Sequence, residues 1–403
     1  MKRRSLLLLP LSFGLPALAG GPQQLPLTDR LAALQKRSLL PGFAVAVVSN
    51  KKVLYQRGFG LADVAGRRAY TEETVQNVGS VSKTVVGVAL VKAIELGYFG
   101  LDTEIERILP FKVRNPHLPG AITVRQLVTH TSSIVDDEDI YGHAYTIMPD
   151  ADRKGPLYKA FERDSTVPGR RDASLGAFLK NYLSPGGARY RKSNFAKAAP
   201  GSTYHYSNIG SALAAWLVEL KSGMGFDAFT RRHIFEPLGM HATRWHADPA
   251  LAQRQASVYD HKGRAYPRYG LVTYPDGGLT TSVSDLGRFL MAMVDGFHGG
   301  AGILSRAGFA LLFKPQFPPD ALPAGSPPGE PNSGVFWRIR KNGQVGHTGS
   351  DPGITAFMFI DPAKGTGRIL MTNTEFGDAE GNDDPRVVQQ VREIWSALAE
   401  VRS

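Results

Sequence analysis

The sequence contains no cysteine among its 403 residues. That absence excludes disulfide bonds, thiol nucleophiles, zinc sites built on thiolates and a lipoprotein cysteine. Long hydrophobic runs are lacking as well, because no apolar stretch after the N-terminal segment reaches the roughly 18 residues of a membrane-spanning helix. Hydrophobic residues still make up 42% of the chain, which excludes global disorder and supports a sizeable core. The length suits two domains.

Acidic residues are too few to balance the basic ones. The formal charge is +11, a value that can indicate a nucleic-acid or membrane-surface partner. The cations are mostly scattered along the chain. The densest cluster comprises Arg189, Arg191, Lys192 and Lys197. For this cluster, a solvated loop is favoured over a polyanion-binding site. We therefore expect no nucleic-acid partner. A polyanion-binding protein is kept as a rival hypothesis, and it predicts salt-sensitive binding.

The first nineteen residues have the three parts of a secretory signal peptide. Residues 2–4 are cations, residues 6–15 form a short apolar core, and residues 17–19 (Ala-Leu-Ala) put small residues where a signal peptidase cuts. We predict removal of residues 1–19 and export to the periplasm or the medium, with no transmembrane segment in the mature chain. The pair Arg3-Arg4 leaves the twin-arginine route open beside the general secretory route.

Hydrophobic periodicity predicts one antiparallel sheet, formed from both ends of the chain, around a mostly helical middle. Helices are predicted over residues 28–38, 81–96, 124–130, 174–183, 211–221 and 385–401, the second of them buried. Strands are predicted over residues 43–49, 53–60, 335–340, 344–348, 354–360 and 368–373, with a hairpin turn at Asn342-Gly343. Residues 320–332 predict a surface loop. The predicted domains are a mixed domain (24–80 and 279–403) and a mainly helical one (81–278).

Ser80 and Lys83 stand at the start of the buried helix. This spacing places a hydroxyl and an amine on one helix face, a turn apart. A lysine whose pKa is lowered by desolvation or by another cation can take the serine proton, and the helix N-terminus offers N–H donors to an oxyanion. The alternative is an N-capping serine beside an exposed lysine, because Ser-x-x-Lys alone is a weak pattern. A charge inside an apolar helix is costly unless it is used or paired.

Tyr206 and Asn208 directly precede the helix predicted over 211–221. A tyrosine near an ammonium can titrate below its usual pKa of about 10 and can then move protons. An asparagine offers a donor and an acceptor to a substrate amide or to Lys83. The tripeptide Tyr-Ser-Asn is by itself nearly uninformative.

The run His347-Thr-Gly-Ser350 follows the Asn-Gly hairpin. Gly349 has no side chain to block a substrate that lies along the strand as an additional β partner. The backbone N–H of Ser350 can act as a second oxyanion donor beside that of Ser80.

In this order, the three motifs resemble those of the penicillin-recognising serine hydrolases, which include class C β-lactamases, D,D-peptidases, D-aminopeptidases and β-lactamase-like esterases. The family signature is Ser-x-x-Lys, then Tyr-x-Asn, then Lys-Thr-Gly or a variant, and the chain has Ser80-Val-Ser-Lys83, Tyr206-Ser-Asn208 and His347-Thr-Gly349. The resemblance covers about residues 28 to 375. It implies an α+β fold of the serine β-lactamase/D,D-peptidase type: a central antiparallel sheet flanked by helices, an inserted all-helical domain, and the active site between them.

The resemblance also implies roles for individual residues. Ser80 is expected to be the acylated nucleophile, and Lys83 and Tyr206 to manage its proton. The expected substrate-binding residues are Asn208, His347, Thr348, Gly349 and Ser350. The interval between Ser80 and Tyr206 exceeds that of compact members, which predicts an enlarged rim around the cleft.

His347 departs from the lysine of the β-lactamases. That lysine is a permanent cation suited to a β-lactam carboxylate, whereas histidine has a reference pKa of about 6.5 and is mostly neutral at pH 7.5. A neutral imidazole still donates one hydrogen bond to an uncharged substrate. We therefore expect a poor β-lactamase and a better esterase or peptidase. Activity on carboxylate-bearing substrates is expected to rise as the pH falls through the titration of His347.

Other polar residues carry weaker predictions. His130 is favoured as structural. The acidic run Asp136 to Asp139 is favoured as a solvated loop, although it can also attract an amine-bearing substrate. The histidines show no pair at metal-ligand spacing on a helix and the carboxylates form no metal-binding loop pattern, so neither a metal nor another cofactor is expected.

The sequence thus predicts an exported serine hydrolase that forms an acyl-enzyme on Ser80 from an ester or amide. A small molecule or short peptide is the expected substrate, possible classes being esters, β-lactams and cell-wall peptides such as those cleaved by D-alanyl-D-alanine carboxypeptidases. Two alternatives remain: a penicillin-binding or penicillin-sensing relative without efficient turnover, and a true β-lactamase. A mass shift on Ser80 that decays indicates an enzyme, and one that persists indicates a binder.

Overall fold

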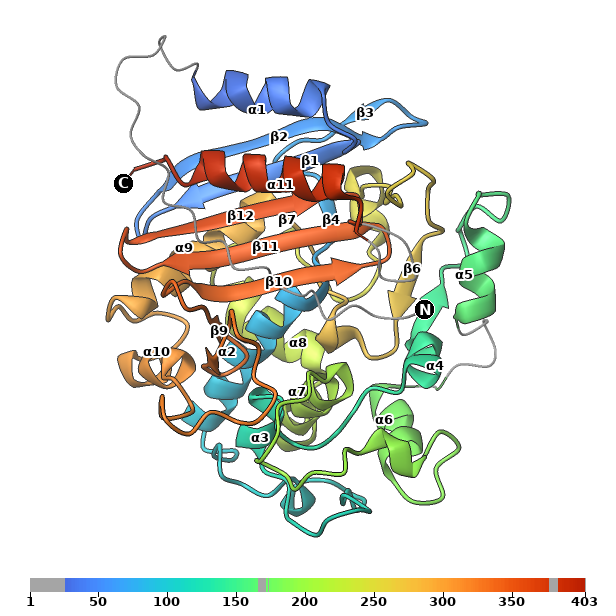
Figure 1. Ribbon diagram of the computed structural model, residues 1–403, viewed down its shortest axis with the longest axis vertical. Coiled ribbons are helices and arrows are strands. Elements are labelled where there is room, and N and C mark those ends of the chain that lie inside the picture. The colour runs from blue at the N-terminus through green and yellow to red at the C-terminus, as the bar shows by residue number, and fades with distance from the viewer. Residues whose placement is uncertain (1–25, 166–171, 173, 377–382, 403) are drawn as a thin grey trace.

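A single large antiparallel sheet joins the two ends of the chain (Figure 1). Its strand order is β3-β2-β1-β12-β11-β10-β9-β8, and β1 pairs directly with β12. The strands are β1 (Gly42–Val48), β2 (Val53–Asp63), β3 (Arg68–Ala69), β8 (Asn332–Ser333), β9 (Arg338–Ile339), β10 (Val345–Asp351), β11 (Ile354–Asp361) and β12 (Thr366–Thr372). The N-terminal hairpin and the C-terminal meander predicted from periodicity are confirmed.

This computed structural model describes residues 26–165, 172, 174–376 and 383–402. The predicted signal peptide, residues 1–19, lies outside the described residues. Within the described ranges, no helix has both the length and the apolar character that crossing a membrane requires.

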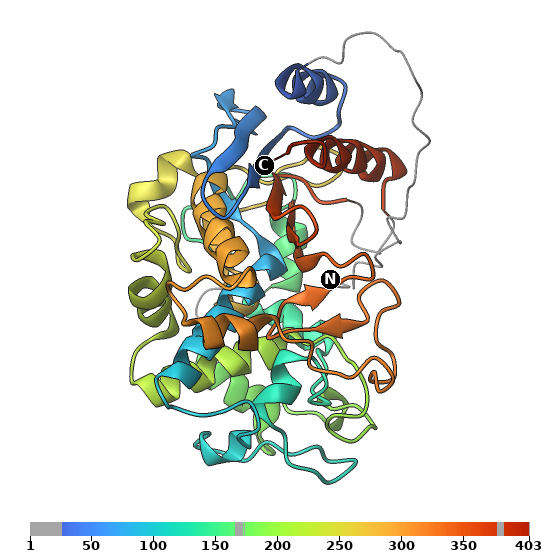
Figure 2. The ribbon, with the colours of Figure 1, turned by 90° about the vertical axis from the view of Figure 1, so that its left-hand side faces the viewer.

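Helices cover both faces of the sheet because successive strand residues point to opposite faces. Phe43, Val45 and Val47 of β1 pack under α1 (Leu27–Lys36) and α11 (Pro385–Leu398), which lie side by side on one face. Their neighbours in sequence face α9 (Val283–Phe297) on the other side, and Figure 2 shows the sheet between these layers. The two apolar clusters fix the position of the sheet, since each buried aliphatic or aromatic side chain contributes about 1.5–3 kcal/mol.

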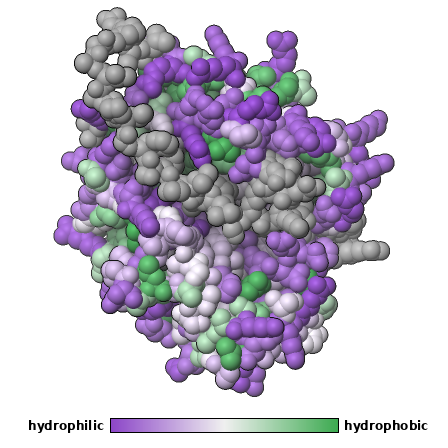
Figure 3. Space-filling view, viewed as in Figure 1, coloured by the Kyte–Doolittle hydropathy of each residue, from purple (hydrophilic) through white to green (hydrophobic). Residues whose placement is uncertain are grey.

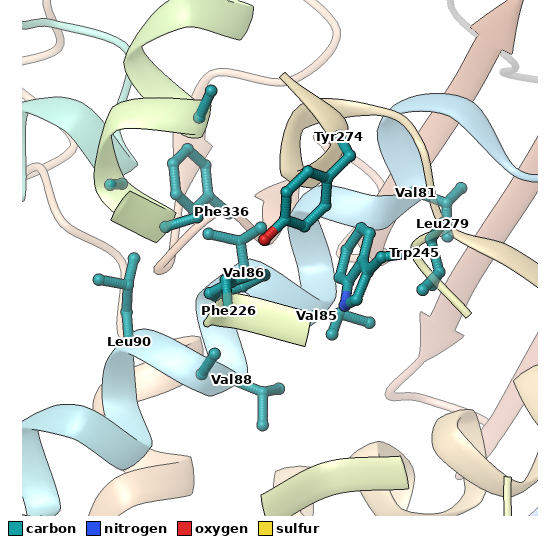
Figure 4. Packing of buried hydrophobic residues seen from close by; sticks show 14 of the residues in the cluster. Val81, Val85, Val86, Val88, Leu90, Phe226, Trp245, Tyr274, Leu279 and Phe336 are labelled. Carbon is teal, nitrogen blue, oxygen red and sulfur yellow. The ribbon is translucent and has the colours of Figure 1, made fainter. Parts of the chain in front are cut away.

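The central helix α2 (Ser82–Glu95) is buried, as predicted. Its valines and Leu90 are enclosed by side chains that come from several distant segments, among them Phe226, Trp245 and Phe336 (Figure 4). The remaining helices are α3 (Val124–Val128), α4 (Glu138–Tyr141), α5 (Tyr158–Asp164), α6 (Leu175–Leu183), α7 (Asn208–Ser222), α8 (Phe226–Thr230) and α10 (Arg306–Phe313). Two short sheets complete the fold: β4 (Val75–Asn77) with β7 (Thr280–Ser282), and β5 (Tyr145–Ile147) with β6 (Tyr269–Leu271).

Several predicted boundaries differ from those of the structure, and two of these differences have a clear physical cause. The strand predicted over 335–340 is interrupted: the chain turns between β8 and β9, with Phe336 at φ 58° and the Gly334 N–H bonded to the Trp337 carbonyl at 2.7 Å. This turn buries both Phe336 and Trp337. Helix α7 begins three residues before the predicted start, because Ser207 caps it by accepting a hydrogen bond from the Gly210 N–H at 2.9 Å.

The α+β architecture agrees with the predicted fold class, while the predicted division into two domains stays a prediction. The face shown in Figure 3 is largely hydrophilic, and its hydrophobic residues are scattered. Scattered exposed apolar residues are ordinary for a folded protein.

Candidate active site

Ser80 lies in a 3-10 turn over Gly79–Val81 that leads into α2. Strand β10 packs so closely against this turn that both contact points require glycine. Gly79 has a φ of 54°, and a Cβ at Gly349 would lie 1.9 Å from the Val78 carbonyl oxygen and 3.2 Å from the Ser80 nitrogen. The turn that carries Ser80 and the strand that carries Gly349 are therefore in direct backbone contact.

The Ser80 hydroxyl lies between an amine and a phenol. The distance to its Oγ is 3.1 Å from Lys83 Nζ and 2.7 Å from the Tyr206 hydroxyl. Lys83 is fully buried, and its Nζ also donates to Asn208 Oδ1 at 2.7 Å and to the Asp276 carbonyl at 2.5 Å. The alternative of a capping serine beside an exposed lysine is therefore wrong, because this ammonium is buried and hydrogen-bonded.

The pKa of Tyr206 differs from the expectation. Burial raises the pKa of this phenol above its usual value and outweighs the hydrogen bond to Ser80 and the Arg338 charge, both of which lower it. The predicted lowering of the phenol pKa by a neighbouring ammonium is thus wrong for the resting site. Tyr206 is therefore a neutral hydrogen-bond donor to Ser80 at neutral pH.

One carboxylate anchors the N-terminus of α7. Asp136 accepts hydrogen bonds from the Ser207 hydroxyl at 2.9 Å, from the Ile209 N–H at 3.1 Å, and from the backbone and side-chain amides of Asn208 at 2.7 and 2.8 Å. The side-chain bond turns Asn208 Oδ1 toward Lys83. A helix N-terminus favours such an anion through its exposed N–H groups and its dipole.

The solvated-loop interpretation of the acidic run is therefore wrong for Asp136. It is also wrong for Asp137, which caps α4 by accepting from the Ile140 N–H at 3.2 Å. Glu138 and Asp139 are exposed, as that interpretation expects. Asp136 approaches α7 only in the folded chain, so no local pattern could have identified it.

His130 packs against the ring of Tyr206. Its ring centroid lies 4.5 Å from that of Tyr206, and its Nδ1 accepts a hydrogen bond from the Ser207 N–H at 3.2 Å. Burial, followed by repulsion from Lys83, lowers the pKa of His130 well below its usual value, so the ring is neutral. The structural role predicted for His130 agrees with this buried position.

Strand β10 carries the third motif along an edge that faces the Ser80 turn. Within the part of the chain that the structure describes, β10 pairs with β9 only through Val345 and Gly346. Residues 347–351 pair with β11 on one side and adjoin the turn on the other. Thr348, Gly349 and Ser350 thus lie on the part of β10 that adjoins the Ser80 turn.

His347 is buried and neutral. Burial, followed by the charges of Arg338 and Lys83, lowers its pKa well below the usual value, so the predicted titration that favours carboxylate-bearing substrates is wrong. Its Nδ1 donates to the Thr348 carbonyl at 2.5 Å, while its Nε2 is buried without a hydrogen-bond partner. The free nitrogen is therefore an acceptor, and the expectation that the neutral ring donates to substrate is also wrong.

Arg338 in β9 is a functional candidate that the sequence analysis missed. Its guanidinium carbon lies 5.8 Å from the Tyr206 ring centroid and 5.6 Å from that of Tyr204. It forms a 2.5 Å ion pair with Glu330, whose side chain is buried. The pairing of β9 with β10 places Arg338 opposite Gly346, beside His347. No local pattern indicates that Arg338 belongs to the site, because its position depends on strand register.

Tyrosines from α4 and β5 line another side of the site. The Tyr141 hydroxyl donates to Asp276 Oδ2 at 2.5 Å, and that of Tyr145 donates to Asp351 Oδ1. Asp276 and Asp351 each adjoin a site element, since the Asp276 carbonyl binds Lys83 and Asp351 follows Ser350. Among the described residues, no group of three or more histidine, aspartate or glutamate side chains is arranged to hold a metal ion.

The chain is similar in sequence to known proteins over most of its length. The family model described as Beta-lactamase matches residues 27–393. The chain is 25% identical over 301 residues to penicillin-binding protein 4 of Amycolatopsis lactamdurans, covering 70% of this chain and 68% of that one. It is 29% identical over 304 residues to esterase EstB of Burkholderia gladioli, covering 72% and 70%. It spans 60% and 57% of the length of two other curated relatives.

A solved structure shows the same fold. The octameric penicillin-binding protein homologue from Pyrococcus abyssi superposes with a TM-score of 0.69 at 23% identity, covering 93% of this chain and 78% of that one.

Proposed function

The chain belongs to the beta-lactamase family, and from that premise we propose that it is a serine hydrolase that cleaves esters or amides through an acyl-enzyme on Ser80. The observation that carries the proposal is the placement of the Ser80 hydroxyl between Lys83 Nζ, at 3.1 Å, and the Tyr206 hydroxyl, at 2.7 Å. A serine needs an adjacent proton acceptor to become a nucleophile, and these two groups together provide one.

The reaction begins when Ser80 Oγ attacks the carbonyl carbon. The serine proton passes to the Lys83–Tyr206 pair, and the carbonyl electrons move to the oxygen. When this tetrahedral intermediate collapses, the bond to the leaving alcohol or amine breaks and that group departs with the proton. Water then attacks the acyl-enzyme in the same way, which releases a carboxylic acid and restores Ser80.

The developing oxyanion is assigned to the backbone N–H groups of Ser80 and Ser350. The close contact between the Ser80 turn and β10 supports this assignment: a Cβ at Gly79 would lie 2.8 Å from the Ser350 nitrogen. Removing one such donor typically costs a hundredfold to a thousandfold in rate. Asn208 is assigned to orient the substrate, because Asp136 and Lys83 hold its side chain in place.

The proposed substrate is a neutral ester or a peptide amide rather than a β-lactam. His347 is neutral and directs an acceptor nitrogen at its surroundings, so it offers no cation to a β-lactam carboxylate. Arg338 is a nearby permanent cation, but its guanidinium is already paired with Glu330. The relative named as an esterase supports this preference, and the relative named as a penicillin-binding protein supports the alternative of slow turnover.

Intact-mass spectrometry with four probes tests the proposal: a β-lactam, a short-chain aryl ester, a D-alanyl-D-alanine peptide and a D-amino-acid amide. We expect a mass shift that decays with the ester or an amide substrate and that is lost in Ser80→Ala. Ser82→Ala is the matched control, because Ser82 is buried and its hydroxyl accepts a structural hydrogen bond from the Leu279 N–H at 3.1 Å. A shift that persists with every probe would favour the penicillin-binding alternative. No shift, or a shift retained in Ser80→Ala, would refute the assignment.

Export is a further part of the proposal and rests on residues 2–19. Expression of the full chain in a bacterium with a periplasm should yield a mature protein that starts at Gly20. N-terminal sequencing of the fractionated protein measures this. Replacing Arg3 and Arg4 with lysines distinguishes the routes, since only the twin-arginine route depends on that pair. An uncleaved protein that stays in the cytoplasm would contradict export.

A further inference from the structure

The catalytic tyrosine lies in a cluster of charged and titratable side chains contributed by several elements. The groups that act on Tyr206 are Lys83 from α2, His130 after α3, His347 from β10, Arg338 from β9, Glu330 from the loop before β8, and Asp136 and Asp276 at greater distance. Both histidines are neutral because their pKa values are lowered. Of the described groups that contact the Tyr206 ring, Lys83 and Arg338 are therefore the cations.

These two cations differ in what they can do. Lys83 hydrogen-bonds Ser80 and must lose its positive charge to accept a proton. The guanidinium of Arg338 keeps its charge at any pH that a protein survives. It lies near the faces of Tyr204 and Tyr206, at 5.6 and 5.8 Å, an arrangement that holds a cation in place. Arg338 is the charge that persists beside the site throughout the reaction.

The counter-ion of Arg338 belongs to the proline-rich segment predicted as a surface loop. Glu330 is buried there and pairs with both Arg338, at 2.5 Å, and Arg340, at 3.3 Å. The same segment binds the chain just before Tyr206, since the Tyr204 N–H donates to the Ala324 carbonyl at 2.8 Å. The predicted surface loop is largely exposed, as expected, but its buried Glu330 places an anion beside Arg338.

We propose that Arg338, with its charge moderated by Glu330, is a positioning residue that favours the proton-accepting form of the Lys83–Tyr206 pair. A fixed positive charge disfavours an ammonium at Lys83 and favours a phenolate at Tyr206, so it acts in the same direction whichever group takes the proton. Glu330 opposes this effect. The cation that assists proton transfer in this chain thus comes from β9, one strand away from the position that His347 occupies. This inference rests on the proposed function.

Removing the charge of Arg338 and removing that of Glu330 should shift the pH dependence of acylation in opposite directions. A merely structural role of these residues would not produce opposite shifts. Acylation of Ser80 by a neutral aryl carbamate, which transfers its carbamoyl group to the serine and releases a phenol, should rise with pH as the pair loses a proton. In Arg338→Gln, that rise should move to higher pH by on the order of one unit, so acylation below the midpoint slows about tenfold. In Glu330→Gln, the rise should move to lower pH. Arg338→Lys keeps the charge and should keep the midpoint near that of the native protein.

Arg340→Gln is the matched control. It removes an equal charge and disturbs the same partner, but the Arg340 guanidinium lies over the Phe359 ring at 3.6 Å rather than over Tyr206. The pH midpoint of acylation should therefore shift less in Arg340→Gln than in Arg338→Gln.

The experiment measures the acylation rate by intact mass from pH 5.5 to 9.5, together with the melting temperature of each variant. Opposite shifts in Arg338→Gln and Glu330→Gln support the inference. If Glu330→Gln does not fold, the contrast between Arg338→Gln and Arg338→Lys decides. Variants that merely slow acylation at every pH with an unmoved midpoint, or Arg338→Lys behaving like Arg338→Gln, would overturn it. Absence of labelling in the native protein would instead refute the proposed function.

Discussion

At the scale of single residues, the environment of His347 determines what the third motif can do. A histidine in water changes charge between pH 5 and 8, but this one is buried beside Arg338 and Lys83, and all three influences lower its pKa. Its one donor nitrogen is used within its own strand. The same residue type in the same motif would act as a pH-dependent anion receptor if it were exposed, so burial decides between the two roles.

A direct prediction follows for substrates of different charge. The ratio of acylation rates for an anionic β-lactam and a neutral aryl ester should stay constant from pH 8 to pH 6, because His347 stays neutral throughout. His347→Gln should leave this ratio equally flat, and rate measurements over that range test both statements. A ratio that rises toward pH 6 in the native protein but not in His347→Gln would show that the imidazole titrates after all.

At the scale of elements, the N-terminus of α7 shows how a helix end can orient a polar side chain. Ser207 caps the helix, and Asp136 satisfies further N–H groups while it fixes Asn208. Helix α7 therefore does more than support the core, because its first residue belongs to the site. Removing the anion should affect both the stability of the protein and the placement of the asparagine.

Asp136→Asn should lower the free energy of unfolding by about 1–3 kcal/mol and also slow acylation of Ser80. The cause is that a neutral amide replaces an anion at a helix N-terminus and turns one acceptor into a donor. Asp139→Asn is the control, since Asp139 belongs to the same acidic run but is exposed. Denaturant unfolding and acylation rates measure both effects. Equal behaviour of the two variants would contradict the role assigned to Asp136.

The elements also show which features a sequence can predict. Hairpins and buried helices were predictable because alternation and turn residues are local, as at Asn342-Gly343, where the turn confirms the prediction. The early start of α7 and the turn at Phe336 were not, because tertiary contacts determine both. Asp136 comes to the site from a loop that is distant in sequence, and Arg338 is placed there by strand register. Neither position can be predicted from the neighbouring residues.

At the scale of the whole molecule, buried histidines link stability to pH. His130 and His347 have folded-state pKa values well below the usual 6.5, so below that pH the unfolded chain binds protons that the folded protein does not. Stability is therefore fully present above about pH 6.5 and is lost as the pH falls below it.

The free energy of unfolding should fall between pH 6.5 and pH 5 by up to roughly 1.4 kcal/mol per pH unit for each of these histidines. Carboxylates that are stabilised in the folded state, such as Asp384 with a pKa of about 2, contribute only at lower pH. Urea unfolding at several pH values measures the slope, and His347→Gln should reduce it. A slope that is flat in the native protein would contradict the buried, neutral assignment of both rings.

The pairing of β1 with β12 has a consequence for the order of folding. A ribosome makes β1 first and β12 almost last, so the central pair of strands cannot form until nearly the whole chain exists. Closing such a long loop is slow, because its entropic cost precedes the contacts that compensate for it. The nascent hairpin of β1 and β2 must meanwhile expose an unpaired edge. A polypeptide that cannot complete its sheet early stays unfolded for longer. This is an advantage for any protein that passes through a membrane channel as an unfolded chain.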